Sequence, residues 1–198
     1  MIVTIHQPEH FPYMGFFQKA SLADVLILLD NVKFRKNYYQ NRNQYMDKAG
    51  KIHWFTVPVS KGSTSLEIKD VKVSNDPTWK KKLVTSIRQN LDFDISRFYD
   101  HNLLVDINCE GIEWAFKELG IKTKIIRASN LDSYGKKSEL LANLCKSLDA
   151  KKYISGPSGK DYLDMSFFEN IDVEFFQPKV KNNLSCLYNI CKGDTCLF

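Results

Sequence analysis

Residues 2–30 read IVTIHQPEHFPYMGFFQKASLADVLILLD, and this stretch decides the fold class. The apolar run 2–5 predicts a first strand, which ends before a proline that removes a backbone donor and restricts its neighbour. Residues 13–22 predict a helix. The continuous apolar run 25–29 is typical of a strand buried on both faces, as in a parallel sheet. The stretch therefore predicts a β–loop–α–β unit.

The rest of the chain continues this alternation of strands and helices. Residues 31–48 show little periodicity and indicate an irregular, aromatic-rich insertion after the second strand. Asp76-Pro77 favours a helix start, and Gly120 favours a helix end. We expect an α/β fold in a single domain over 1–198, Rossmann-like, with a mainly parallel sheet flanked by helices. Further strands are predicted at 52–59, 66–73, 122–127, 153–154 and 173–176, and further helices at 77–91, 98–119, 138–148 and 184–191.

The composition excludes several classes of protein. The chain has 198 residues, a formal net charge of +5, 43% hydrophobic and 26% charged residues, which is typical of a globular protein. No apolar segment reaches the length of about 18 residues that a membrane span needs, and no signal peptide is recognisable, so we expect a cytoplasmic protein. The basic residues form no stripe that would predict nucleic-acid binding. The five cysteines contain no C-x-x-C pair, so we expect free thiols and no metal site.

A first candidate cluster follows the first predicted strand. It contains His6, Gln7, His10 and Tyr13. Ligands of parallel sheets usually bind at the carboxyl ends of the strands. Either histidine could act as an acid or base near neutral pH, and the amide of Gln7 could bind a substrate. The alternative is a rigid surface turn without a chemical role.

A second cluster follows the buried strand 25–29. Asp30 should open at the same sheet edge as His6, and Lys33 lies just beyond it. Arg42 offers a planar fork for phosphate or carboxylate. Its neighbours Asn41 and Asn43 could bind sugar hydroxyls. The alternative is an Asn-rich turn with a surface arginine, since asparagine side chains often bond their own backbone.

A third cluster is a strand-to-helix turn rich in glycine and serine. Backbone N–H groups in such a turn can cradle phosphate oxygens, with a lysine as counter-charge. The Walker A spacing is absent. The alternative is a plain connector in which the glycines allow the turn. The phosphate-binding candidates are Ser155, Gly156, Ser158, Gly159 and Lys160.

These residues, with others along the chain, resemble the WbqC-like family. The most specific part of the resemblance is the pair of motifs His6-Gln7-Pro8 and Asn41-Arg42-Asn43. Further matches are Pro12-Tyr13, Gly15-Phe16-Phe17, Lys19, Ala23-Asp24, Leu29-Asp30, Val57-Pro58-Val59, Trp79, Leu119-Gly120-Ile121, Tyr153-Ile154-Ser155-Gly156, Tyr162-Leu163 and Leu184-Ser185. The resemblance implies a cytoplasmic protein of bacterial surface-polysaccharide biosynthesis, typically of O-antigen (lipopolysaccharide) or capsule.

The first functional hypothesis is a transferase that moves an acyl or aminoacyl group to a nucleotide-linked amino sugar. His6 would be the acid or base, Asp30 would orient or polarise, and Arg42 would hold phosphate. The turn 155–160 would bind a second phosphate or the donor. No cofactor is certain beyond an acyl or nucleotide donor, and the partner is a small nucleotide sugar. The oligomeric state stays open.

Two alternatives come from other classes of protein. The start of the chain loosely resembles the nucleotide-binding start of HIGH-type nucleotidyltransferases, but Phe16 follows Gly15 where a histidine would be needed. The other alternative is a non-catalytic partner of a glycosyltransferase complex. It would use an exposed aromatic patch of Tyr38, Tyr39 and Tyr45.

Overall fold

The computed structural model describes all 198 residues, and the chain folds into two compact units. The sheet unit consists of Met1–Gln7, Gly15–Asp30 and Ile121–Lys179. The hairpin unit consists of Pro8–Met14, Asn31–Gly120 and Val180–Phe198. Each unit is thus assembled from three separate segments of the chain. The expectation of a single domain over 1–198 stays a prediction beside this division.

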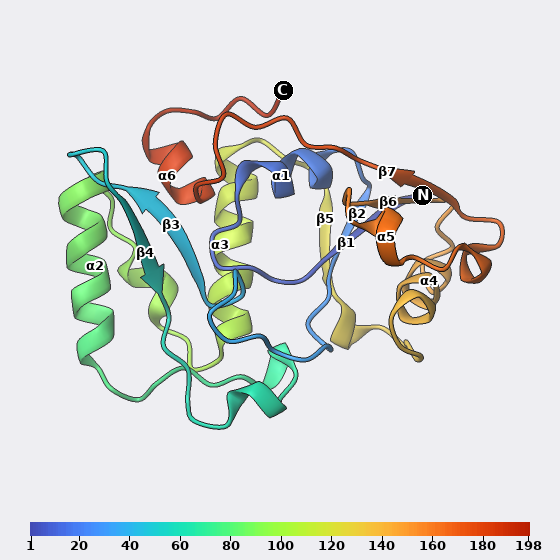
Figure 1. The fold of residues 1–198 in the computed structure, drawn as a ribbon, viewed down its shortest axis with the longest axis horizontal. Coiled ribbons are helices and arrows are strands. Elements are labelled where there is room, and N and C mark those ends of the chain that lie inside the picture. The colour runs from blue at the N-terminus through green and yellow to red at the C-terminus, as the bar shows by residue number, and fades with distance from the viewer. The chain divides into compact units, whose positions relative to one another are not determined.

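The sheet unit contains a five-stranded sheet in which every pairing is parallel, with the order β5-β2-β1-β6-β7 (Figure 1). This arrangement confirms the predicted α/β class and the parallel sheet. Strand β1, the first in the sequence, lies in the middle, between β2, which follows it in the chain, and β6, which comes from a distant part. The strands are β1 (Ile2–His6), β2 (Val25–Leu28), β5 (Lys124–Arg127), β6 (Lys152–Ser155) and β7 (Asp172–Phe175).

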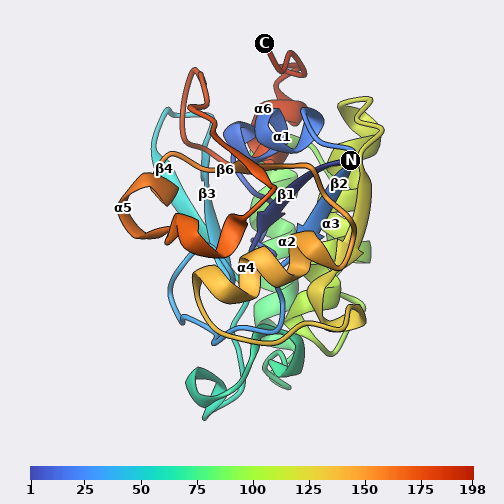
Figure 2. The ribbon, with the colours of Figure 1, turned by 90° about the vertical axis from the view of Figure 1, so that its right-hand side faces the viewer.

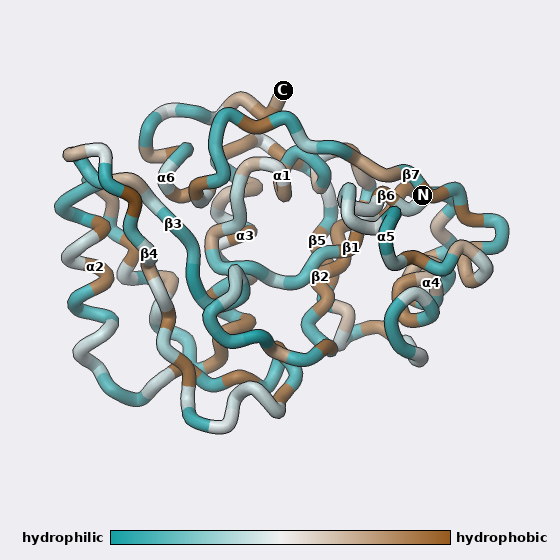
Figure 3. The backbone as a smooth tube through the Cα atoms, in the orientation of Figure 1, coloured by the Kyte–Doolittle hydropathy of each residue, from teal (hydrophilic) through white to brown (hydrophobic).

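The central strands are apolar because helices cover both faces of the sheet. All four residues of β2 are buried, and the strand is drawn mostly in brown in Figure 3. Helices α1 (Met14–Ser21) and α4 (Ser138–Lys146) lie on opposite sides of β1 and β2 in Figure 2. Such an arrangement follows when right-handed crossovers leave the middle of a parallel sheet in both directions. A short helix, α5 (Gly159–Tyr162), and the 3-10 helices Ala128–Asn130 and Met165–Phe168 complete the unit.

The hairpin unit is built around an antiparallel pair and an aromatic core. Strands β3 (Arg42–Met46) and β4 (Ile52–Thr56) pair with each other. The ring of Phe11 lies in the core of this unit, 5.1 Å from Phe98 and 5.9 Å from Trp114 between centroids. The helices are α2 (Thr78–Leu91), α3 (Leu104–Glu118) and α6 (Cys186–Cys191), with 3-10 helices at Ser63–Ser65, Ile68–Asp70 and Ser96–Tyr99.

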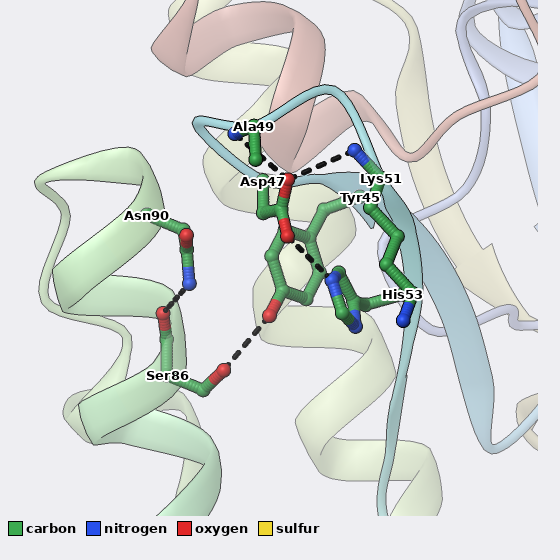
Figure 4. Close-up of polar contacts among 7 residues, drawn as sticks. All are labelled: Tyr45, Asp47, Ala49, Lys51, His53, Ser86 and Asn90. Carbon is green, nitrogen blue, oxygen red and sulfur yellow. Dashed lines mark hydrogen bonds and ion pairs between the residues drawn. The ribbon is translucent and has the colours of Figure 1, made fainter.

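The tip of the hairpin is closed by one carboxylate, as Figure 4 shows. Asp47 accepts hydrogen bonds from the backbone N–H groups of Ala49 and Lys51, and from Nε2 of His53 at 2.7 Å. These bonds lower the pKa of Asp47, the one from the backbone of Lys51 most and the one from His53 next. The hydroxyl of Tyr45 bonds Ser86 of α2 at 2.8 Å, so the hairpin is tied to that helix. The contacts give His53 a structural partner.

Three expectations about the insertion and its surroundings were wrong. Residues 66–73 do not form a strand, because Ile68–Asp70 turns into a 3-10 helix that buries Ile68. The helix predicted at 98–119 begins only at Leu104, since Phe98 and Tyr99 belong to a separate 3-10 turn. The insertion that we expected to be irregular contains the regular strand β3. Alternate residues of this strand are buried, although its sequence is mostly polar. None of the helices is long and apolar enough to span a membrane.

Candidate functional site

The carboxyl edge of the parallel sheet gathers polar side chains from neighbouring strands of the sheet unit. His6 ends β1 and pairs in register with Leu28 of β2, which also pairs with Arg127 at the end of β5. Asp30 follows β2 by two residues, and Ser155 ends β6 on the other side of β1. Four strand ends therefore place an imidazole, a carboxylate, a guanidinium and a hydroxyl along one edge, as expected of a parallel sheet.

Asp30 is fully buried and holds its neighbours in place. Its carboxylate accepts a hydrogen bond from Nε of Arg127 at 2.7 Å. It also accepts one from the backbone N–H of Ser129 at 2.8 Å and one from the Ser129 hydroxyl at 2.7 Å. Charge-assisted bonds of this kind are strong and directional. Asp30 thus positions Arg127, whose side chain keeps 29% of its surface exposed at the sheet edge.

His6 is held as a neutral imidazole. Its Nδ1 lies 3.1 Å from the carbonyl oxygen of Gln7, which can only accept, so Nδ1 carries the proton and Nε2 does not. The pKa of His6 falls to about 3, first because burial removes water and second because the Lys19 ammonium lies nearby. Lys19 is itself buried and donates to the carbonyl of Ile5 at 3.0 Å. The sheet edge therefore offers an imidazole nitrogen that accepts hydrogen bonds.

Ser155 lies against the start of the helix that follows it. Its hydroxyl is buried without a hydrogen-bond partner of normal geometry, although it comes close enough to Tyr162 to moderate the raised pKa of that phenol. A Cβ on Gly159 would lie 2.2 Å from Oγ of Ser155 and 3.1 Å from the ring of Phe175. Only glycine allows this close approach. Gly159 is therefore required by the packing of the turn.

The turn after β6 uses part of its own hydrogen-bonding capacity. The N–H of Gly159 donates to Gly156, and that of Lys160 donates to Pro157. The exposed polar side chains of the turn are those of Ser158 and Lys160, and the Lys160 ammonium lies 5.8 Å from the ring centroid of Phe175. A phosphate bound at this turn would therefore be contacted mainly by side chains and not by a ring of backbone N–H groups. The phosphate-binding role of these residues stays a prediction.

The asparagines of the second cluster hold the backbone of the hairpin unit. Asn43 is buried and donates to the carbonyls of His10 at 3.1 Å and Phe11 at 2.8 Å. Asn41 is buried, donates to the carbonyl of Val57, and accepts from the N–H of Asn37. Both side-chain amides therefore bond the backbone of their own unit and stabilise its fold. A substrate-binding role for Asn41 and Asn43 remains a prediction with no contact in its favour.

Other predicted site residues lie in the hairpin unit too. The guanidinium of Arg42 stacks on Trp54, 4.1 Å from the ring centroid, and its buried Nε has no hydrogen-bond partner. His10 is fully buried, bonds the Tyr99 hydroxyl through Nε2 at 3.2 Å, and has its pKa lowered to about 3 by burial. Lys33 is exposed, and Tyr13 is half-buried. The structure brings His6, Gln7, Asp30 and the turn 155–160 into the sheet unit, and the other predicted residues into the hairpin unit.

Sequence reasoning missed three residues of the sheet edge. Arg127 and Ser129 lie 97 and 99 positions after Asp30, so no local motif could join them to it. The signal that was available is the polar end of the predicted strand 122–127. Lys19 was noted only as part of a family pattern, although a lysine among the apolar residues of a helix is a sign of a buried charge.

The structure contains no group of three or more His, Cys, Asp or Glu side chains that could hold a metal ion, and all five cysteines are free thiols.

Comparisons with known proteins point to one protein family. The model of the WbqC-like protein family matches residues 7–188. The uncharacterized protein Rv1507c of Mycobacterium tuberculosis is 27% identical over 184 residues, which cover 86% of this chain and 79% of that protein. No solved structure matches the chain significantly.

Proposed function

The chain belongs to the WbqC-like protein family, and from this membership and the sheet edge we propose a cytoplasmic enzyme of bacterial surface-glycan biosynthesis. The proposed reaction transfers an acyl or aminoacyl group to the amine of a nucleotide-linked sugar of the O-antigen or capsule. The observation that carries the proposal is the buried Asp30 carboxylate. It accepts a hydrogen bond from Arg127 and so positions this guanidinium at the same sheet edge as the neutral His6.

The charges of the sheet edge support the binding of an anionic group. Arg127 and Lys19 carry two positive charges there, beside the carboxylate of Asp30. Lys160 adds a third, exposed cation at the end of β6. A guanidinium carries a permanent positive charge, and its planar fork matches the oxygens of a phosphate. Arg127 is therefore our candidate for the phosphate contact that the sequence pattern assigned to Arg42.

His6 is our candidate for the group that accepts a proton. When a sugar amine attacks an acyl carbonyl, the nitrogen must lose a proton, and Nε2 of His6 is the unprotonated atom at this edge. A pKa of about 3 is low for a base that works near neutral pH. A bound phosphate would oppose the charge of Lys19, which is one cause of the lowering. Binding of the substrate should therefore raise the pKa of His6 toward neutrality.

The test is an assay in which each substrate carries a free or a blocked amine. The enzyme is incubated with nucleotide-linked amino sugars and acyl-CoA or aminoacyl donors, and the masses of the products are measured by mass spectrometry. We expect one sugar to gain the mass of the acyl group, and its N-acetylated counterpart to gain none. Arg127→Gln should raise the KM for the nucleotide sugar, and His6→Asn should lower kcat, because general-base catalysis contributes about 100-fold or more.

Binding measurements separate this proposal from its alternatives. A nucleotide sugar at 100 times its Kd should stabilise the protein by about 2.7 kcal/mol, a shift of a few degrees in Tm, and Arg127→Gln should abolish the shift. A shift with nucleoside triphosphates alone would contradict acyl transfer and favour nucleotidyl transfer. No shift with any of these ligands, in a folded protein, would favour the non-catalytic partner. For that alternative, Tyr45 is buried, which leaves only Tyr38 and Tyr39 for an aromatic patch.

A further inference from the structure

The segment 31–61 of the hairpin unit carries the positive charge of the whole chain. It contains seven of the 28 basic residues but only one of the 23 acidic residues, whereas the remainder of the chain has 21 basic and 22 acidic residues. The net charge of +5 therefore arises from this segment alone. Its basic residues are Lys33, Arg35, Lys36, Arg42, Lys48, Lys51 and Lys61.

These seven cations have no counter-charge within the chain. None of them forms an ion pair, and the single acid of the segment, Asp47, pairs with His53 at 2.7 Å. All of them except Arg42 are exposed. Like charges gathered on one unit repel one another and attract anions. The segment is therefore suited to an anionic partner.

The hairpin of β3 and β4 has one covered and one outer face, because side chains alternate along a strand. Tyr45 and Phe55 belong to the covered face, and the hydroxyl of Tyr45 bonds Ser86 of α2 (Figure 4). On the outer face, Ile52 is 53% exposed and Trp54 is 44% exposed. Two large apolar side chains thus project into solvent side by side. The outer face consists of Arg42, Gln44, Met46, Ile52, Trp54 and Thr56.

A row of rings with an arginine at each end adjoins this face. Arg42 stacks on Trp54 at 4.1 Å, and Arg35 stacks on Tyr38 at 4.3 Å from the ring centroid. Tyr39 joins the two pairs, since its centroid lies 6.1 Å from Trp54 and 5.3 Å from Tyr38. Neither guanidinium forms a hydrogen bond or an ion pair within the chain. Two arginines without a counter-ion therefore flank the exposed rings.

Basic side chains beside exposed aromatic and aliphatic ones are typical of a protein face that lies on an anionic membrane. Lysine and arginine are attracted to anionic headgroups, and Trp and Tyr rings favour the level of the headgroups. An aliphatic side chain such as Ile52 can enter the boundary of the acyl chains. Single-stranded nucleic acid would also suit cations and rings, but it offers no apolar layer. The exposed Ile52 therefore favours a lipid surface.

We propose that the outer face of the β3–β4 hairpin binds the surface of a lipid bilayer with anionic headgroups. Ile52 and Trp54 enter the headgroup layer, and Arg35, Arg42 and Lys51 contact lipid phosphates. The inference goes beyond the proposed transferase, because it concerns a surface of the hairpin unit and no reaction. Vesicle binding needs no sugar substrate, so either proposal can fail while the other holds.

Binding is measured by sedimentation of the full chain with vesicles of two compositions. One is phosphatidylcholine with about 30% phosphatidylglycerol, and the other is phosphatidylcholine alone. We expect at least ten-fold stronger binding to the anionic vesicles, and a decline as salt rises above about 0.1 M, because salt screens the charges.

Tryptophan emission reports which face meets the lipid. Trp54 is exposed, whereas Trp79 is half-buried and Trp114 is buried. We expect the emission to shift to shorter wavelength when anionic vesicles bind, since Trp54 leaves water. Trp54→Leu keeps an apolar side chain, so it should still bind but should lose the shift.

Paired lysine variants test the charges. Lys48→Gln together with Lys51→Gln should weaken binding at least ten-fold, since each basic residue near an anionic surface contributes a factor of about five. The matched control is Lys136→Gln together with Lys137→Gln, which removes the same charge from two exposed residues of the sheet unit. The control should weaken binding by no more than about two-fold.

Several results would overturn the proposal. Equal binding to the two kinds of vesicle, or no binding to either at low salt, would exclude recognition of anionic lipid. Equal losses in the two lysine pairs, or binding without the emission shift, would show that another face meets the membrane. Binding of a single-stranded oligonucleotide without binding of vesicles would assign the basic face to nucleic acid. Should a variant fail to fold, the vesicle comparison and the emission of the wild type still decide.

Discussion

The two units each hold one arginine in a defined place, but they do so with different chemistry. In the sheet unit, a fully buried carboxylate fixes Arg127 through its Nε. In the hairpin unit, the ring of Trp54 supports Arg42 from one face, and Nε finds no partner. A carboxylate sets the direction of the guanidinium fork, whereas a ring sets only its plane. Arg42, although it lies in the recognisable motif Asn41-Arg42-Asn43, is therefore less firmly oriented than Arg127.

The largest expected effect breaks the carboxylate side of this comparison. Asp30→Asn should lower the free energy of unfolding by about 3–5 kcal/mol, because it removes the buried charge that Nε of Arg127 bonds and turns an amide N–H toward the donors of Ser129. Urea denaturation measures the loss, with the exposed Asp132→Asn as the control. A loss below about 1 kcal/mol would show that Arg127 and Ser129 do not depend on Asp30.

The second effect sharpens the comparison through one neutral histidine in each unit. His6 and His10 have pKa values lowered to about 3, so the unfolded chain binds protons below pH 6.5 that the folded chain does not. Stability should therefore fall as the pH drops from 6.5, by about 2 kcal/mol per histidine at pH 5. Carboxylates of lowered pKa such as Asp47 titrate below this window.

Urea midpoints at pH 7 and pH 5 measure this dependence. The variants His6→Asn and His10→Asn should each remove about half of it. An equal midpoint at both pH values in the wild type would contradict the neutral state of the two histidines. A dependence that only His10→Asn removes would show that water reaches His6 in the sheet unit.

The third effect tests how tightly the sheet edge is packed at the end of β6, on the other side of β1 from Arg127. Gly159→Ala should cost about 1–3 kcal/mol, since its Cβ would meet the hydroxyl of Ser155. Gly156→Ala is the matched control in the same turn, because nothing lies within 4 Å of the position its Cβ would take. Adding Ser155→Ala to Gly159→Ala should recover part of the loss in Tm. Equal effects at the two glycines would refute the packing argument.

The smallest effect concerns the ring side of the comparison. A double-mutant cycle of Trp54→Leu and Arg42→Gln should give a coupling of about 0.5–1 kcal/mol, the range for an exposed cation–π pair. Thermal unfolding of the four proteins measures it. A coupling of zero would mean that the stacking contributes nothing to stability, and Arg42 would then be held only by the backbone of β3.

Sequence patterns predicted the elements whose signals are local. The run 25–29, the start at Asp76-Pro77 and the end at Gly120, which has a φ of 67°, all correspond to observed elements. The pattern failed at 66–73, where apolar residues serve the packing of a 3-10 turn and not a strand. It failed again at β3, because pairing with β4 and burial on one face outweigh a polar sequence.

For the candidate site, the sequence indicated the edge but not its partners. The carboxyl ends at His6 and Asp30 were predictable, since strand ends in a parallel sheet share an edge. That Asp30 meets Arg127 depends on the pairing of β2 with β5, which no local pattern contains.

The central position of β1 has a consequence for how the chain is made. Strand β1 leaves the ribosome long before its neighbour β6, which lies some 150 residues later: Thr4 bonds the carbonyl of Ile154 in β6. Until then, one edge of an apolar strand stays unpaired, and closing so long a loop is slow. The nascent protein should therefore be most prone to aggregation late in its synthesis, and chaperones should matter most just before β6 emerges.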